Sequence, residues 1–243
     1  MSDRAVDQAP LAALSLLERG ELRLLHLLPR ASNFTFLAEV DDGEDRALAV
    51  YKPRQGETPL WDFPQGTLCL REVAAYLVAG DLGWPDVPPT VLREGPHGQG
   101  SVQLFVEADL REHYFTLRER HAETFREFAA FDVVVGNGDR KAGHCLLGRD
   151  GRIWSVDHGL CFRAEPWLRT VIWDFAGEPV PPRVLADLRR LEGELRGGAL
   201  RSRLLEVLDR EEVEATADRA AALVAEGRYP EPGPARSHPW PAI

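Results

Sequence analysis

Cysteine is scarce in this sequence, and its three occurrences are far apart. An odd and scattered set does not make a disulfide framework, and it fits a reducing compartment. The chain also lacks an apolar run long enough to cross a bilayer, and its start lacks the apolar stretch of a signal peptide. We therefore expect a cytoplasmic protein with no integral membrane association.

Positive charge is in deficit as well. The 243 residues include 29 Lys and Arg against 39 Asp and Glu, which gives a formal net charge of -10. A nucleic-acid-binding protein needs a basic face, and a polybasic membrane anchor needs clustered Lys and Arg. The composition therefore argues against both kinds of partner, and the length suits one large domain or one bilobal unit.

Lysine and asparagine are the rarest polar residues that carry chemistry. The lysines are Lys52 and Lys141, and the asparagines are Asn33 and Asn137. Arginine readily replaces lysine on a surface, but a planar guanidinium does not replace a compact ammonium where a site needs a point charge. The two lysines are therefore candidates for functional positions.

The hydrophobic pattern predicts a β-rich first part and a mainly helical second part. A helix is expected over 67–80, with Thr67 as its N-cap. The other expected helices cover 10–19, about 110–135, 182–195 and 211–226, and the expected strands cover 21–28, 33–40, 46–52, two runs within 88–107 and a pair around the turn at 148–152.

We therefore predict an α+β, bilobal, protein-kinase-like fold, with ATP between the lobes. The N-lobe would cover 1–107 and the C-lobe 108–227. Residues 228–243 are rich in proline, so we expect a mobile tail there.

Phosphoryl transfer needs a phosphate loop, a lysine with an acidic partner, a hinge for adenine, a catalytic Asp and a metal ligand. Residues suited to these parts occur in that order along the chain. They are Ser32 and Asn33 in a turn, Lys52 at a strand end, Glu72 in a helix, Phe105 and Val106 at the change to helices, Asp139 in a loop, and Asp157 after a strand.

Two stretches, "FDVVVGNGDRKAGHCLL" and "WSVDHGLCF", resemble the signature of the phosphatidylinositol 3- and 4-kinases. "AVYKPRQGE" is similar to the Lys-Pro strand of type II phosphatidylinositol 4-kinases. The resemblance covers about Ser32 to Phe162 and extends to a small group of mostly actinobacterial kinase-like proteins. It implies a nucleotide-binding phosphotransferase that uses ATP with Mg²⁺ or Mn²⁺.

The resemblance also implies roles for individual residues. Lys52 would contact the nucleotide phosphates, with Glu72 as its partner and Glu57 as a competing acid. Asp139 would orient the acceptor hydroxyl. The remaining roles belong to Asn137 as a brace of the loop backbone, Lys141 as a further catalytic-loop residue, and Asp157 as the principal metal ligand.

Two features depart from the family pattern. His144 stands five residues after Asp139, where lipid kinases have an asparagine that binds metal, so His144 is a candidate second ligand. The loop "RASNF" contains no glycine, which predicts a loose grip on the phosphates.

Three functional classes stay open. The first is an active kinase whose acceptor is a protein, a small alcohol or an inositol lipid; the acidic chain favours a soluble acceptor. The second is a pseudokinase that binds nucleotide without transferring phosphate. In the third, a transition metal would be held by His144, Asp139, Asp157 and His158 in a hydrolase. Asp139 and Arg140 could also form a simple surface ion pair in a turn.

Overall fold

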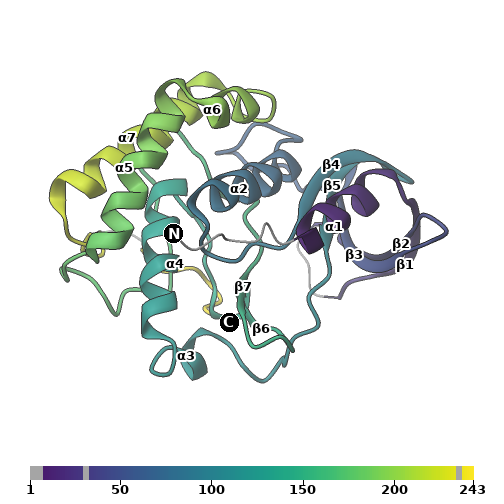
Figure 1. Cartoon of the computed structure of the whole chain (residues 1–243), viewed down its shortest axis with the longest axis horizontal. Coiled ribbons are helices and arrows are strands. Elements are labelled where there is room, and N and C mark those ends of the chain that lie inside the picture. The colour runs from purple at the N-terminus through teal and green to yellow at the C-terminus, as the bar shows by residue number, and fades with distance from the viewer. Residues whose placement is uncertain (1–7, 30–32, 234–236) are drawn as a thin grey trace. The chain divides into compact units, whose positions relative to one another are not determined.

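The structure is a computed structural model that describes residues 8–29, 33–233 and 237–243 (Figure 1). The chain forms two compact units. Unit 1 consists of Met1–Val73 and Pro88–Phe105, and unit 2 consists of Ala74–Val87 and Val106–Ile243. The boundary falls inside helix α2 (Leu68–Leu82), so each unit receives part of this helix.

Unit 1 is built around a five-stranded antiparallel sheet of order β1-β2-β3-β5-β4. A helix, α1, precedes the sheet and packs on β4 and β5. The elements of this unit besides α2 are α1 (Gln8–Arg19), β1 (Glu21–Leu27), β2 (Phe36–Asp41), β3 (Arg46–Pro53), the short 3-10 turn η1 (Arg54–Gly56), β4 (Thr90–Gly95) and β5 (Gly98–Leu104).

Strand β3 shows how the alternation of its side chains positions a candidate residue. Ala49 and Tyr51 are buried in the core of unit 1, together with Val40 and Val102. Successive side chains of a strand point to opposite faces, so Lys52 lies on the other face from this core. Lys52 is accordingly only partly buried.

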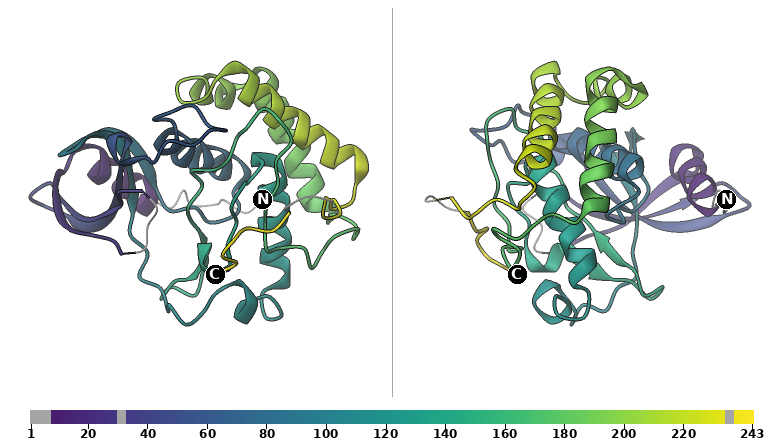
Figure 2. Two further views of the ribbon diagram at one scale, coloured as in Figure 1. Left: turned by 180° about the vertical axis from the view of Figure 1, so that it is seen from behind. Right: turned by 60° about the vertical axis from the view of Figure 1, so that its left-hand side comes forward.

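Unit 2 is mainly helical and carries one two-stranded sheet, β6-β7. Helix α7 packs against both α4 and α5, and Figure 2 shows α5 and α7 side by side in green and yellow. The elements are α3 (Tyr114–Leu117), α4 (Ala122–Val135), the 3-10 turn η2 (Ala142–His144), β6 (Cys145–Leu147), β7 (Ile153–Ser155), α5 (Pro182–Gly197), α6 (Ala199–Leu204) and α7 (Arg210–Glu226).

The core of unit 2 is aromatic along α4 and aliphatic along α5. Phe125, Phe128 and Phe131 of α4 are fully buried, and Leu188 and Leu191 of α5 belong to the same core. These spacings of three residues place each set on one helix face. The predicted α+β class and the order of its β-rich and helical parts are confirmed.

Two segments of unit 2 differ from the sequence-based expectation. Helix α6 was not predicted, because its six residues are too few to show a periodic pattern. The predicted tail 228–243 is anchored to unit 2 at some of its positions: Tyr229 is buried, and the indole Nε1–H of Trp173 donates to the Ser237 carbonyl at 3.1 Å. Trp240 in the same stretch is 87% exposed, and the mobility of the tail stays a prediction. Proline restricts the backbone without preventing its neighbours from packing.

All three cysteines are buried, and none forms a disulfide. Burial in apolar surroundings disfavours the thiolate and raises the pKa of Cys69 and of Cys145 to about 12. Cys69 belongs to unit 1, whereas Cys145 and Cys161 belong to unit 2.

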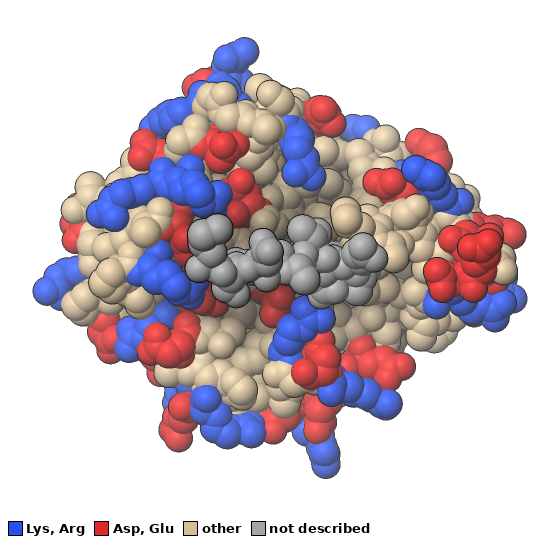
Figure 3. Space-filling model, in the orientation of Figure 1, with Lys and Arg blue, Asp and Glu red and all other residues tan. Residues whose placement is uncertain are grey.

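Charges of both signs are interspersed over the described residues on the face drawn in Figure 3. Several arginines pair with neighbouring carboxylates, such as Arg46 with Asp41 at 2.6 Å. Within the described ranges, no helix combines the length and the apolar character that a membrane span requires.

Candidate active site

In unit 1, Lys52 forms an ion pair with Glu72. The Lys52 ammonium donates a short hydrogen bond to Oε1 of Glu72. The Glu72 side chain is 3% exposed and that of Lys52 is 24% exposed, so the carboxylate is held inside the unit while the ammonium keeps access to solvent. The lysine is therefore positioned by an acid from α2.

Glu57, the competing acid, has a different partner. Its Oε1 accepts a hydrogen bond from the backbone N–H of Cys69 at 2.9 Å, in the first turn of α2. A carboxylate at this place satisfies a donor that the helix leaves unpaired. Thr67 was predicted to cap this helix, but its hydroxyl donates to the Pro64 carbonyl at 2.7 Å.

The predicted phosphate loop is described only in part. Ser32 lies outside the described residues. Asn33 is described, and its side-chain oxygen accepts a hydrogen bond from the Thr58 N–H at 2.8 Å. The loop is therefore fastened to the segment that follows β3, and its predicted contact with phosphate stays a prediction.

Phe105 and Val106, the predicted hinge, stand where the chain passes from unit 1 to unit 2. The Phe105 N–H donates to the Leu48 carbonyl at 2.9 Å. That amide is engaged within the sheet of unit 1 and cannot also donate to a base. The role of both residues in binding adenine stays a prediction.

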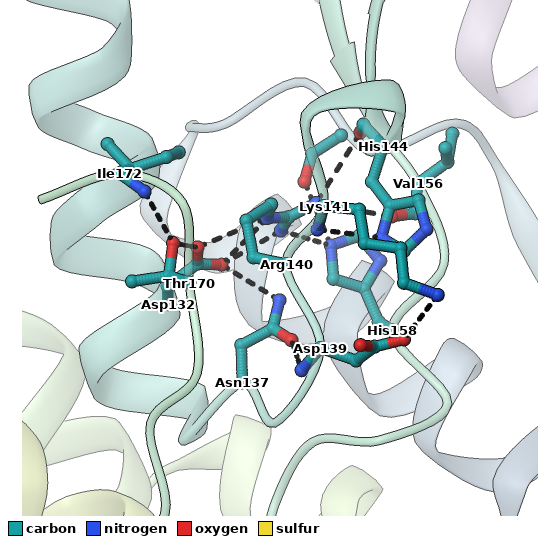
Figure 4. Close-up of polar contacts among 11 residues, drawn as sticks. Asp132, Asn137, Asp139, Arg140, Lys141, His144, Val156, His158, Thr170 and Ile172 are labelled. Carbon is teal, nitrogen blue, oxygen red and sulfur yellow. Dashed lines mark hydrogen bonds and ion pairs between the residues drawn. The ribbon is translucent and has the colours of Figure 1, made fainter. Parts of the chain in front are cut away.

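In unit 2, the catalytic loop follows directly from the end of α4. Gly136 ends the helix with a left-handed backbone, at a φ of 60°. Asn137 then donates from Nδ2 to Asp132 at 2.9 Å, and its Oδ1 accepts a hydrogen bond from the Asp139 N–H at 3.0 Å (Figure 4). Asn137 thus ties the backbone at Asp139 to the last turn of α4.

Arg140 belongs to the interior and not to a surface ion pair. Its Nη2 donates to Oδ1 of Asp132 at 2.9 Å, and neither side chain is exposed. Asp132 also accepts a hydrogen bond from the Thr170 hydroxyl at 3.2 Å. Asp132 therefore contacts Asn137, Arg140 and Thr170 at once. The alternative of a surface ion pair between Asp139 and Arg140 is wrong, because Arg140 is buried and pairs with Asp132.

His158 is committed to this buried network. Its Nε2 lies 3.1 Å from Nη2 of Arg140 and 2.9 Å from the Ser155 hydroxyl. A guanidinium can only donate, so Nε2 accepts and the ring proton is assigned to Nδ1. The Nε2 lone pair therefore accepts a hydrogen bond inside the protein and is not available to a metal ion. His158 is thus not one of the metal ligands that the hydrolase alternative requires.

Asp139 and Lys141 face each other in the loop, with Nζ of Lys141 3.1 Å from Oδ2 of Asp139. Burial raises the pKa of Asp139 above its usual range, the Lys141 ammonium opposes this, and the Asp157 carboxylate adds to it. A carboxylate with a raised pKa is a better proton acceptor than an ordinary aspartate.

Asp157 and His144 are also brought together. Nε2 of His144 lies 3.3 Å from Oδ2 of Asp157, whose side chain is 51% exposed. Nδ1 of His144 accepts a hydrogen bond from the Lys141 N–H at 3.3 Å, so the ring proton is assigned to Nε2, on the side of Asp157.

The backbone of Asp157 is left-handed, with a φ of 62°. This region costs free energy for any residue but glycine, and such residues gather at functional sites. Asp157 suits a divalent ion that takes most of its oxygen ligands from water and nucleotide phosphates. The assigned tautomer of His144 turns an N–H toward Asp157, so His144 becomes a ligand only in the other tautomer, which frees Nε2. Among the described residues, no group of three His, Cys, Asp or Glu could hold a metal by itself.

A second segment holds the catalytic loop from the other side. The Gly138 N–H donates to the Leu160 carbonyl at 2.8 Å, and the Arg169 N–H donates to the Asn137 carbonyl at 2.8 Å. A Cβ at Gly138 would lie 2.4 Å from Nε1 of Trp167. The loop therefore packs against Trp167 so closely that only glycine fits.

Sequence reasoning missed Asp132 and Thr170. Asp132 could have been found, because it is the only charged residue in the apolar stretch "FAAFDVVV". A buried aspartate must have partners, and the nearest polar residues along the chain are those of the catalytic loop. Thr170 lies 38 residues away from Asp132 and carries no comparable signal.

The sequence is similar to proteins of known name. A family model described as phosphatidylinositol 3- and 4-kinase matches residues 92–191. Protein Rv2133c of Mycobacterium tuberculosis is 39% identical over 264 residues, which cover 94% of this chain and 95% of that protein. Phosphatidylinositol 4-kinase gamma 4 of Oryza sativa is 26% identical over 78% of this chain but only 40% of its own length.

The fold also matches a solved structure. The crystal structure of the Golgi casein kinase with Mn/ADP bound aligns with a TM-score of 0.55 and 14% sequence identity. The alignment covers 91% of this chain and 76% of that one. At this identity the likeness shows the fold alone, and that fold is the predicted kinase-like one.

Proposed function

Since the chain belongs to the phosphatidylinositol 3- and 4-kinase family, we propose that it binds ATP with a divalent cation and transfers the γ-phosphoryl group to a hydroxyl acceptor. The observation that carries this proposal is the brace from Asp132 through Asn137 to the Asp139 backbone. It fixes a carboxylate with a raised pKa inside the segment that matches the family.

Each unit carries residues that would have a part in the proposed reaction. Lys52, oriented by Glu72, would bind the nucleotide phosphates as a point charge. Asp157 would hold the cation, joined by His144 in the tautomer that frees Nε2, and the bound cation would neutralise charge on the phosphates. Asp139 would orient the acceptor hydroxyl and accept its proton, and Lys141 would stabilise the charge that develops beside it.

The acceptor is proposed only by class. The rice relative is named for phosphatidylinositol, but this chain spans 40% of that protein and carries a net charge of -10. A basic surface would favour an anionic membrane, so the acidic composition supports a soluble protein or small alcohol as acceptor. Assays with inositol, with phosphatidylinositol vesicles and for autophosphorylation separate these sources.

A nucleotide-binding module without transfer is the second candidate. It is favoured by His144, whose Nε2 proton is directed at Asp157 and whose nitrogen is a poorer ligand than oxygen for Mg²⁺. This candidate predicts ATP binding without phosphate release.

The test is ATP titration with and without Mg²⁺ or Mn²⁺, followed by a phosphate-release assay. Asp157→Ala should remove the metal-dependent part of the affinity, whereas Asp139→Ala should keep the affinity and lower turnover on the order of 10²–10⁴-fold. If neither substitution changed metal-dependent binding or turnover, the site would be wrongly assigned.

A further inference from the structure

A polar hollow of about 280 Å³ opens in unit 2, and none of its lining residues belongs to the candidate active site. Three segments line it: the stretch after α2, the beginning of α4, and the turn between β6 and β7. Their side chains Asp86, His121, Thr124, Glu127 and Arg152 face it. Its volume lies just below the range of pockets that bind drug-sized molecules, so a smaller ligand fits.

Several polar groups in this hollow are not used by the protein. Within the described residues, the Thr124 hydroxyl and the His121 imidazole have no hydrogen-bond partner. The nearest cation to the Asp86 carboxylate is Arg152, at 3.7 Å, which is beyond hydrogen-bond distance. Two groups without a partner and one loosely paired carboxylate, from two separate segments, therefore converge on one space.

The charge around the hollow is negative. Two arginines near the hollow are each surrounded by carboxylates. Arg152 forms an ion pair with Asp150 at 2.7 Å. Arg183 contacts Glu127 and also lies 3.3 Å from Asp187. With Asp86 there are four carboxylates and two guanidiniums, which leaves two negative charges in excess.

The environment of Asp86 agrees with this count. Burial raises the pKa of Asp86 above its usual range, Arg152 opposes the rise, and Asp150 adds to it. The Asp86 side chain is 45% exposed, and a carboxylate with no cation within hydrogen-bond distance gains from a positively charged partner.

We propose that this hollow binds a small organic cation, a primary amine whose ammonium group donates to Asp86. An ammonium group has three donors, so it can satisfy Asp86 and also donate to the Thr124 hydroxyl or to a neutral His121. The site is separate from the proposed phosphotransfer and does not depend on it.

The test uses three four-carbon probes of similar length that differ in charge: 1,4-diaminobutane is positive, 1,4-butanediol is neutral and succinate is negative. The readout is the indole N–H signal of Trp84 in ¹⁵N NMR spectra, because Trp84 lines the hollow and donates to Asp187 at 2.9 Å. We expect the signal to move with the diamine and to stay unchanged with the diol and with succinate.

Variants assign the binding to this place. Asp86→Asn keeps the shape and removes the charge, and it should weaken diamine binding about tenfold or more. Asp109→Asn, an exposed carboxylate elsewhere in unit 2, should leave binding unchanged. Thr124→Met should abolish binding by filling the hollow, which keeps the test decisive if Asp86→Asn does not fold.

Four results would overturn the proposal. They are the absence of diamine binding to the folded wild-type protein, equal binding of the diol, stronger binding of succinate, and binding that survives both Asp86→Asn and Thr124→Met.

Discussion

Asp132 and Arg140 form an ion pair from which solvent is fully excluded, eight residues apart in the chain. Burial by itself lowers the pKa of Arg140, but the Asp132 carboxylate raises it above its usual value, so the guanidinium stays charged. Because Asp132 lies in α4 and Arg140 in the catalytic loop, the pair joins a core helix to the candidate site.

Asp132→Asn should destabilise the protein by about 3–5 kcal/mol, because it leaves the Arg140 guanidinium buried without its counter-charge. Thr170→Val removes one hydrogen bond to the same carboxylate and should cost only about 1 kcal/mol. Urea unfolding of both variants measures the difference. An effect of Asp132→Asn no larger than that of Thr170→Val would show that the pair is not what holds the loop.

Lys52→Met should weaken ATP binding or lower turnover on the order of 10²–10³-fold, without unfolding the protein. Lys52→Arg should also impair turnover, because a guanidinium does not present the same point charge at the end of β3. The measurements are ATP affinity and phosphate release, with the exposed Arg46→Lys as control. Full activity in Lys52→Arg would refute the argument from the scarcity of lysine.

Asp139→Asn should make the protein more stable at neutral pH while lowering turnover. The pKa of Asp139 is raised in the folded state, so ionising this group costs folding free energy as the pH rises above its unfolded pKa. The stability gained by the variant should therefore be absent at strongly acidic pH, grow as the pH rises from the unfolded pKa to the folded pKa, and level off above it. Thermal unfolding across this pH series measures it.

Asp109→Asn is the matched control for that series, since it should change stability in the opposite direction. Hydrogen bonds from Arg111 lower the pKa of Asp109 to about 2. The stability that this carboxylate contributes is present above its unfolded pKa and is lost as the pH falls toward about 2. A loss of stability in Asp139→Asn at neutral pH would mean that its pairing with Lys141 outweighs burial.

His144→Asn should change the metal preference. An amide oxygen suits Mg²⁺, whereas an imidazole nitrogen suits Mn²⁺ better. We therefore expect the wild type to prefer Mn²⁺ and the variant to gain Mg²⁺-supported phosphate release. If ATP binding persisted with no change in metal preference, His144 would not be a ligand, and the nucleotide-binding module would become the better description.

Gly138→Ala should lower turnover and stability together, because the new methyl group would displace the Trp167 indole from the loop. Overpacking of this kind costs about 1–3 kcal/mol. Trp167→Ala in the same chain should relieve the clash, so unfolding free energies of the two single variants and the double variant form a thermodynamic cycle. Additive effects would contradict the close contact.

Candidate site residues could be predicted from the sequence where a residue type is rare or occupies a distinctive position. Lys52 could be singled out because lysine is scarce in the chain, Asp139 because it lies in the polar loop after an apolar run, and Asp157 because a strand ends just before it. The contacts of Asp132 with Asn137 and Thr170 were harder to predict from the sequence. Thr170 reaches Asp132 across 38 residues, and such a contact depends on the packing of unit 2 and not on local pattern.

The N-terminus of α2 also has a contact that local sequence rules did not predict. Thr67 has the right residue type and position for an N-cap, yet Glu57 supplies the oxygen from twelve residues away from Cys69. A local rule predicts that a helix start needs an acceptor, but it does not say which of several nearby acceptors the folded chain delivers. Lys52 pairs with Glu72 and not with Glu57, whose Oε1 accepts from the Cys69 N–H.

The buried cysteines can report on local unfolding in each of the two units. A thiol that is shielded and kept protonated does not react with a maleimide until its surroundings come apart. Cys69 reports on unit 1, and Cys145 and Cys161 report on unit 2. Mass spectrometry of the order in which these three are alkylated would therefore rank the local stability of the two units without any substitution.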